Sequence, residues 1–593
     1  MSESKDAPPT AARAPLGDVD SLSANSSPSW TDFLTADPEA AANAPNHTSR
    51  EVKSGHYVPV KPSPLGDPRL VVHSASMAAA LGLSEAACLA PRFASFFSGD
   101  VDVLAGFMPW ATPYALSIYG QPVVRQCPFG NGNGYGDGRA ISLGEVVFEG
   151  DRWEMQLKGA GPTPFCRGAD GRAVLRSSVR EFLASEAMHH LGVSTTRALS
   201  LVVSGADTVQ RPWYSNKDQG GAGDVPSLDD PRIAHVPLEY RKMLLAELAS
   251  KARGPDVMVR EQCAITCRTA PSFFRVGHIE LLSRRIVRAT KARGAGSAEA
   301  QTAVAEFRRS AQHLLDREFP DIAAQQDAPL PEQLVAMLRA SSQQLATLTA
   351  GWLRVGFVQG NFNSDNCLVA GRTMDYGPFG FMQRYESLWN MWESSGDHFG
   401  YMNQPTAGGK NLESLATAVR VVLDLDGNPA HSREAAAVVE AHAQVARDAV
   451  DDAFRRKLGL SSFGPDERAL FAGLGELMET SEADFTIFWR QLADVAEVGL
   501  AEGKAEGKAE GIGNTDAWWP LLDDAFYAPL TAETKAGWAA WLGEWMGRLR
   551  EEVSQDGSGS PEAVAAGMRL VSPKYVPREW MLVTVRRLAL RGG

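Results

Sequence analysis

The segment from Gln359 to Asp375 includes four polar side chains that share one kind of chemistry: Asn361, Asp365, Asn366 and Asp375. They bring two carboxylates and two carboxamides into seventeen residues. Carboxylate and carboxamide oxygens are the ligands that hard divalent cations prefer, and such cations accompany phosphate groups in nucleotide sites. The segment therefore predicts a metal-dependent site for nucleotide chemistry.

The spacing of these residues is similar to that of the catalytic and metal loops of protein kinases, with one important difference. In kinases the pattern H-R-D-x-x-x-x-N precedes D-F-G, and the Asn and the second Asp hold magnesium. Asn366 and Asp375 fill the two metal positions, whereas Asn361 stands in the position of the kinase base and cannot accept a proton. Gln359 replaces the leading His. We therefore expect Mg²⁺ or Mn²⁺ with ATP, but not ordinary kinase chemistry.

A glycine-rich stretch upstream could cover the phosphates of a nucleotide. Five glycines fall within the nine residues from Gly130 to Gly138, and Arg139 follows them. Without a Cβ atom, glycine lets backbone N–H groups approach phosphate oxygens closely. A surface turn rich in Gly and Asn would have the same composition, so the interpretation depends on the neighbouring segments.

Two strand-like runs follow this stretch, Ala140 to Phe148 and Trp153 to Lys158, and the turn between them is typical of a hairpin. In the second run, alternation places Lys158 on the face opposite the apolar residues, at the end of the strand. Lys158 is then either a phosphate ligand or an ordinary solvated lysine.

An amphipathic helix is predicted from Ala173 to Leu191, because apolar residues recur there at helical spacing and Gly192 follows as a typical C-terminal cap. Glu181 lies beside the apolar stripe of this helix, where it could form an ion pair with Lys158. A further strand is expected from Ala198 to Val203, which would complete a small β-rich lobe.

Several long motifs resemble the selenoprotein O family. They are Gly-Asp-Gly-Arg139, Leu-Lys158-Gly-Ala-Gly-Pro-Thr-Pro, Ala-Asp170-Gly-Arg-Ala-Val-Leu-Arg-Ser-Ser-Val-Arg-Glu181-Phe-Leu, Arg268-x6-Arg275, and Asp365-Asn366 with Asp375-Tyr-Gly-Pro-Phe-Gly-Phe. The similarity runs from about His56 to about Arg578. It implies an α+β, bilobal protein-kinase-like fold with a helical C-terminal extension. It also implies that ATP binds in a flipped orientation and that AMP, rather than phosphate, is transferred to hydroxyl side chains of proteins.

The resemblance implies a set of residues that bind the nucleotide. They are Gly136, Gly138, Arg139, Lys158, Asp170, Gly171, Glu181, Arg268, Arg275 and Asp375. Within this set, Lys158 would contact phosphate while paired with Glu181. Arg268 and Arg275 would clamp phosphates, a role that suits the planar fork of a guanidinium group.

The resemblance also implies the catalytic roles. Asn366 and Asp375 would hold the metal ion, and Asp365 would be the base of the flipped site. With the α-phosphate near the metal, a substrate hydroxyl would attack there and pyrophosphate would leave toward Lys158. From the residues alone, Asp365 could equally be a residue that orients the neighbouring Asn366.

The expected partners are ATP and proteins that bear Ser, Thr or Tyr hydroxyls, with self-modification as one outcome. Two other functions stay open: a phosphotransferase that binds ATP in the ordinary orientation, and a pseudoenzyme that binds nucleotide only to shape a partner surface. The neutral Asn361 counts against the first function. The joint presence of Lys158, Asn366 and Asp375 counts against the second.

Composition limits the remaining possibilities. The 593 residues carry a net charge of −13 and no basic run, which argues against a nucleic-acid partner. No apolar run is long enough to span a membrane, and no secretory signal is recognised. The six cysteines are expected to be reduced thiols. The resemblance implies a mitochondrial location for a eukaryotic source and a cytoplasmic location otherwise. The first fifty residues, however, are not rich in arginine as a transit peptide is.

The chain is expected to have five regions. These are a disordered leader over 1–50, an N-lobe with glycine loop, lysine strand and glutamate helix over 51–205, a mainly helical C-lobe over 206–500, a flexible low-complexity insertion over 501–515, and a helical C-terminal extension over 516–593. The tryptophans between Asp516 and Glu552 are expected in the core of the last region.

Overall fold

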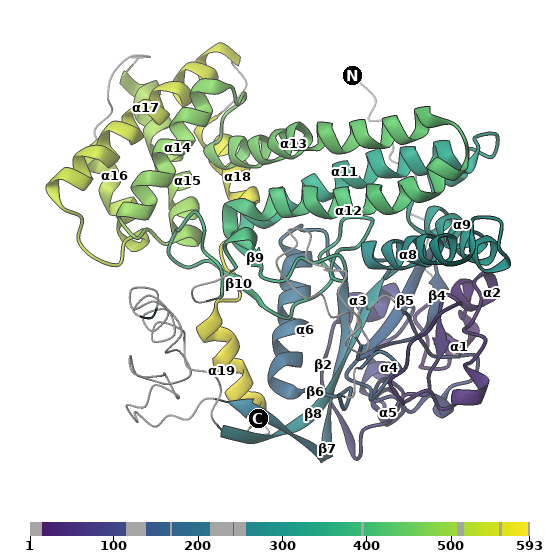
Figure 1. The fold of residues 1–593 in the computed structure, drawn as a ribbon. Coiled ribbons are helices and arrows are strands. Elements are labelled where there is room, and N and C mark those ends of the chain that lie inside the picture. The colour runs from purple at the N-terminus through teal and green to yellow at the C-terminus, as the bar shows by residue number, and fades with distance from the viewer. Residues whose placement is uncertain are drawn as a thin grey trace, which may run out of the picture.

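The computed structural model describes residues 15–113, 138–166, 169–213, 241, 257–392, 396–506, 515–556 and 560–590. Within these ranges the chain is a mixed α/β structure, in which an antiparallel sheet with its covering helices lies beside a larger helical part (Figure 1). Among the described residues, no helix has the length and apolar character needed to cross a membrane.

The large sheet has the strand order β1-β3-β4-β5-β8-β7-β2, and β6 pairs with β8. All of these pairings are antiparallel. The strands are β1 (Val58–Pro59), β2 (Pro68–His73), β3 (Trp110–Ala111), β4 (Ala140–Phe148), β5 (Asp151–Lys158), β6 (Ala173–Val174), β7 (Arg197–Trp213) and β8 (Val257–Ala270).

The predicted hairpin is present as β4 and β5. Its two-residue turn, Glu149-Gly150, has φ angles of 52° and 90°, which is the backbone geometry that matches the twist of paired strands. On β5, Met155 and Leu157 are fully buried in the apolar core. The opposite face of the strand is also buried but polar, and Lys158 ends it.

The predicted amphipathic helix is present as α6 (Leu175–His190), which packs on β7 and β8. The other helices of the sheet-bearing part are short. They are α1 (Ser21–Ala24), α2 (Ser29–Phe33), η1 (Ala41–Asn43), α3 (Ala75–Ala80), α4 (Glu85–Leu89), α5 (Pro91–Phe97) and η2 (Val101–Val103).

The helical part also contains a two-stranded sheet of β9 (Phe357–Gln359) and β10 (Phe379–Phe381), which bracket residues 360–378. Residues 361–366 are called the catalytic loop and residues 375–378 the metal loop, after their kinase counterparts. The helices of the helical part are α8 (Val276–Arg293), α9 (Ala298–Glu318), α10 (Pro320–Ala323), α11 (Leu330–Val355), η4 (Asp397–Phe399), η5 (Tyr401–Asn403), α12 (Gln404–Leu425), α13 (Pro429–Leu458), α14 (Pro465–Thr480), α15 (Phe485–Glu506), α16 (Thr515–Leu522), η6 (Asp523–Ala525), α17 (Ala532–Asp556), α18 (Pro561–Val571) and α19 (Glu579–Leu590).

Three of the tryptophans between Asp516 and Glu552 are fully buried in the core, as predicted. Trp518, Trp538 and Trp545 have no exposed surface, and they pack in one apolar cluster with residues of α14 and α15. Burying such large rings contributes strongly to the stability of this helical part.

The prediction of a disordered leader over 1–50 is wrong for residues 15–50. This segment forms α1, α2 and η1, and Trp30 is only 3% exposed. The Trp30 ring stacks on Trp110, and its backbone N–H donates to the carboxylate of Glu145 at 2.7 Å. A few apolar side chains buried against the sheet and α9 therefore outweigh the polar composition of the segment.

Two predicted boundaries also need correction. The N-lobe does not end at residue 205, because β7 continues to Trp213 and pairs with β8, so that residues 257–270 belong to the same sheet. The predicted insertion over 501–515 begins later, because α15 continues to Glu506 and Glu502 accepts a hydrogen bond from the Trp518 indole at 3.3 Å. Residues 507–514 lie outside the described ranges.

Candidate active site

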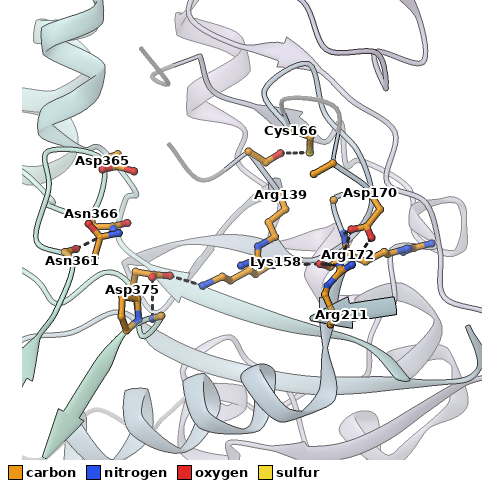
Figure 2. Close-up of a pocket in the computed structure, with 15 residues that line it drawn as sticks. Arg139, Lys158, Cys166, Asp170, Arg172, Arg211, Asn361, Asp365, Asn366 and Asp375 are labelled. Carbon is orange, nitrogen blue, oxygen red and sulfur yellow. Dashed lines mark hydrogen bonds and ion pairs between the residues drawn. The ribbon is translucent and has the colours of Figure 1, made fainter. Parts of the chain in front are cut away.

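A cavity of about 550 Å³ is lined by residues of both parts of the molecule (Figure 2). The sheet-bearing part contributes Gly138, Arg139, Lys158, Cys166, Ala169, Asp170, Gly171, Arg172 and Arg211. The loops next to β9 and β10 contribute Asn361, Asp365, Asn366, Asp375, Gly377 and Pro378. Tertiary structure therefore brings the predicted lysine, the predicted base and the predicted metal ligands to one space.

Lys158 bridges the two sides of this cavity. Its Nζ lies 2.9 Å from Oε2 of Glu181 on α6 and 2.5 Å from Oδ1 of Asp375. The ion pair expected between Lys158 and Glu181 is therefore present. Lys158 is 8% exposed, and a lysine so deeply buried needs compensating carboxylates of this kind.

Arg268 lies on β8, behind Lys158, and is 2% exposed. Its Nη1 is 3.2 Å from Oδ1 of Asp375 and 3.4 Å from Oε1 of Glu181, and its Nη2 donates to Gln156 at 2.7 Å. Arg268 is not among the described residues that line the cavity. The arrangement differs from the expected phosphate clamp, because this guanidinium neutralises the two carboxylates that hold the lysine.

Arg275 is likewise buried, at 1% exposed, and does not line the cavity among the described residues. Its Nη1 donates to the backbone carbonyl of Asp365 at 2.9 Å. The N–H of Gly277, in the first turn of α8, donates to the carbonyl of Ser364 at 2.9 Å. Such N–H groups have no partner within their own helix, so the start of α8 and Arg275 together hold the backbone of the catalytic loop.

The catalytic loop is also tied internally and to the metal loop. Asn366 donates from Nδ2 to the carbonyl of Asn361 at 3.0 Å. Gln359, in the position of the kinase His, donates from Nε2 to the carbonyl of Asp375 at 2.6 Å. Asp365 is 4% exposed. Figure 2 shows Asn361, Asp365 and Asn366 on the same side of the cavity as Asp375, across from Arg139 and Asp170.

The residues predicted to hold a metal fit that role in part. Asn366 and Asp375 both line the cavity, and each offers an oxygen of the kind that Mg²⁺ binds. Within the described ranges, no group of three or more His, Cys, Asp or Glu side chains could hold a metal ion by itself. An Asn and Asp pair suits a magnesium ion that takes its other ligands from phosphate and water.

A turn of Asp170, Gly171 and Arg172 forms another wall of the cavity. Gly171 has a φ of +66°, and a Cβ atom there would lie 2.0 Å from the carbonyl oxygen of Gly161, so that only glycine fits. Arg211 on β7 donates to both carboxylate oxygens of Asp170, at 2.7 and 2.8 Å. This bidentate pair lowers the pKa of Asp170.

The end of the glycine-rich stretch contacts the same wall. A Cβ atom on Gly138 would lie 2.2 Å from the carbonyl oxygen of Phe165, which explains the need for glycine there. Arg139 lines the cavity, and its Nη1 donates to the carbonyl of Arg172 at 3.3 Å. Gly136, the other glycine predicted to cover the nucleotide, lies outside the described residues.

Comparison with known proteins agrees with this arrangement. The family profile described as "Protein adenylyltransferase SelO" matches residues 43–216 and 240–588. The chain belongs to the SelO family.

Several relatives of this SelO family member bear the name "Protein nucleotidyltransferase YdiU". The protein of Xanthomonas oryzae pv. oryzae (strain PXO99A) is 35% identical over 539 residues, which cover 90% of this chain and 84% of that protein. The protein of Azoarcus sp. (strain BH72) is 34% identical over 554 residues, which cover 92% and 86% of the two chains. The similarity therefore extends over nearly the whole SelO family chain.

Two charged residues that line the cavity of this SelO family chain were not predicted from the sequence, Arg172 and Arg211. Arg172 has a local signal, because it completes the Asp-Gly-Arg motif that begins at Asp170. Arg211 has no such signal in the neighbouring sequence. It comes close to the Asp170 turn only because β7 pairs with β8.

Proposed function

We propose that this SelO family chain transfers AMP from ATP to hydroxyl side chains of proteins and releases pyrophosphate. One observation carries the proposal: Lys158, Asp365 and the Asn366–Asp375 pair face one cavity, whereas Asn361, in the position of the kinase base, is neutral. Membership in the SelO family and the nucleotidyltransferase name of the relatives support the same reaction. The fold would then be a bilobal protein-kinase-like fold, with the sheet-bearing part as the N-lobe.

In this reaction a substrate hydroxyl attacks the α-phosphorus of ATP. A bond forms between the hydroxyl oxygen and phosphorus, the bond from phosphorus to the pyrophosphate oxygen breaks, and the hydroxyl proton passes to the carboxylate of Asp365. Transfers of this type depend mainly on positioning and on neutralising charge. The hydrogen bonds from Arg275 and Gly277 to the backbone of the catalytic loop would hold Asp365 in place for that step.

The triphosphate would bind against Lys158 and Arg139, which line the cavity on the sheet side. Lys158 would then exchange the carboxylate of Asp375 for a phosphate oxygen, because both compete for the same ammonium group. Mg²⁺ or Mn²⁺, held by Asn366 and the released Asp375, would neutralise phosphate charge when bound. Arg268 and Glu181 would keep Lys158 in place from behind.

ATP labelled at the α-phosphate or at the γ-phosphate distinguishes this proposal from its alternatives. We expect α-label, and no γ-label, to become attached to the chain itself or to an added protein. Transfer of γ-label alone would identify a phosphotransferase instead. ATP binding without transfer of either label to a broad set of added proteins would favour a nucleotide-binding pseudoenzyme. The protein substrates are expected to be selected by surface shape, which no motif encodes.

A further inference from the structure

A second cavity, of about 680 Å³, lies between α8, α9 and the segment that precedes β1. Among the described residues, it shares no lining residue with the candidate active site. Its apolar lining includes Val52, Leu281, Ala289, Ala292 and Ala303. A concave lining that combines apolar and charged residues suits a small molecule with an apolar body and a charged group.

The charged residues of this second cavity are mostly neutralised already. Five cationic and three anionic side chains are found among its described lining residues. Three of its arginines have a carboxylate partner, in the pairs Arg285–Glu306 at 3.1 Å, Arg288–Glu51 at 2.8 Å and Arg293–Glu299 at 2.6 Å.

Arg284 differs from the other arginines of this lining because no described carboxylate lies within hydrogen-bond distance of it. Its Nη1 is 3.9 Å from Oε2 of Glu280, which is beyond hydrogen-bond distance. Its Nη2 is buried and has no hydrogen-bond partner among the described residues. Burial lowers the pKa of Arg284 to about 10. The Arg284 side chain is half-buried, at 23% exposed, and a buried guanidinium nitrogen without a hydrogen bond is unfavourable, so one negative charge in the cavity would relieve it.

The same arginine is close to the catalytic loop. Glu280 accepts a hydrogen bond from the hydroxyl of Ser364 at 2.6 Å, and Ser364 immediately precedes Asp365. The first turn of α8 also contacts this loop, through the hydrogen bond from Gly277 to the carbonyl of Ser364. Two contacts, Arg284 to Glu280 and Glu280 to Ser364, therefore connect Arg284 to the residue that precedes Asp365.

We infer that the second cavity binds a small monocarboxylate with an apolar body, and that binding is transmitted to the catalytic loop through Arg284, Glu280 and Ser364. The carboxylate accepts hydrogen bonds from Arg284 and draws it away from Glu280. The same oxygen of Glu280 faces Arg284 and accepts from Ser364, so without its neighbouring cation it is the stronger acceptor and holds Ser364 more firmly. A single charge is favoured because Lys53, the other cation of this lining without a carboxylate pair among the described residues, is exposed to solvent, whereas Arg284 has a buried nitrogen without a hydrogen-bond partner among them. Binding and transmission are independent of the proposed AMP transfer; only a consequence for catalytic rate would rest on it.

Octanoate is a suitable probe, with octanol and octyl phosphate as matched compounds of the same chain length. By isothermal titration calorimetry on the full chain, we expect octanol to bind at least about tenfold more weakly than octanoate, because it cannot pair with a guanidinium. Octanol that binds as tightly as octanoate would overturn the proposal. Octyl phosphate that binds about tenfold more tightly would overturn the choice of a monocarboxylate.

Two variants locate the binding. Arg284→Ala removes the guanidinium and should weaken octanoate by about tenfold. Ala292→Trp fills the cavity from an exposed position without removing an arginine, and should weaken both octanoate and octanol. Arg308→Ala is the matched control, since Arg308 is exposed on α9 and does not line the cavity. Octanoate affinity that stays at the wild-type level in both cavity variants would show that the probe binds elsewhere.

Hydrogen–deuterium exchange of residues 361–367 tests the transmission without ATP. Saturating octanoate should slow exchange in this segment of the wild-type chain and leave it unchanged in Arg284→Ala. In Glu280→Gln, octanoate should still bind, but the change in exchange should be lost. Unchanged or faster exchange in the wild-type chain would overturn the transmission, whatever the outcome of the AMP-transfer assay.

Discussion

Lys158 and Asp375 are 217 positions apart in the chain, yet Nζ of the lysine lies 2.5 Å from Oδ1 of the aspartate. The contact joins the end of β5 to the loop that precedes β10, so it links the two sides of the candidate active site. Phosphate and metal would compete with this ion pair when ATP binds. Asp375 is therefore a partner of Lys158 in this structure, and under the proposed function it would become a metal ligand once nucleotide binds.

Asp375→Asn tests this double role with little change in shape. The amide keeps an oxygen but loses the charge that attracts both Lys158 and a divalent ion. We expect AMP transfer to fall by about 10² or more, measured with α-labelled ATP over a range of Mg²⁺ concentrations. Glu386→Gln, an exposed carboxylate on the chain segment after β10, serves as the matched control. A near wild-type rate in Asp375→Asn would contradict the assignment of the metal ligand.

Asp365→Asn and Asn361→Asp separate the proposed base from the position of the kinase base. Loss of a general base costs about 10² to 10⁴ in rate, so Asp365→Asn should lower AMP transfer by that amount while ATP binding, measured by titration, changes little. Asn361→Asp should not produce transfer of γ-label, because the nucleotide would still present its α-phosphate to the metal. Kinase activity in Asn361→Asp would show that ATP binds in the ordinary orientation.

Arg211 is expected to act by positioning the Asp170 turn. Arg211→Ala removes the bidentate partner of Asp170, so the KM for ATP should rise by about tenfold, with a smaller effect on kcat. Arg211→Lys keeps the charge but not the fork, and should recover only part of the affinity. Arg69→Ala, an exposed arginine on β2, is the control. A change confined to thermal stability would assign Arg211 to the fold alone.

Glu154 should make stability depend on pH. Burial, with a smaller effect of the neighbouring Glu145 carboxylate, raises its pKa from 4.5 to about 7. The folded chain then keeps a proton that the unfolded chain releases, so the free energy of unfolding should fall as pH rises from about 4.5 to about 7. Over that range the contribution is about 3 kcal/mol.

Glu154→Gln should remove this contribution, because glutamine does not titrate. The measurement is the difference in free energy of unfolding between wild type and variant, from denaturant titrations across the same pH range. Glu149→Gln, in the exposed turn of the same hairpin, should leave the pH dependence unchanged. Parallel pH profiles for wild type and Glu154→Gln would show that Glu154 is ionised throughout.

Local sequence determined those parts of the structure that depend on neighbouring residues. The β4–β5 hairpin and α6 follow from alternation, turn residues and helical spacing, all of which act over a few positions. The short spacing of Asn361, Asp365 and Asn366 likewise places the three residues on one loop. These features were predicted correctly because their causes lie within the segments themselves.

Tertiary structure decided which distant residues meet, and with what surroundings. The resemblance implied that Arg268 and Arg275 bind phosphate, which stays a prediction. Strand pairing and the packing of α8 decided that both are buried, with Asp375, Glu181 and the carbonyl of Asp365 as partners. Arg211 reaches Asp170 only because β7 continues past residue 205. The burial of Trp30 ordered a segment whose composition predicted disorder. In each case the energy comes from contacts between residues far apart in the chain, which local composition and spacing do not contain.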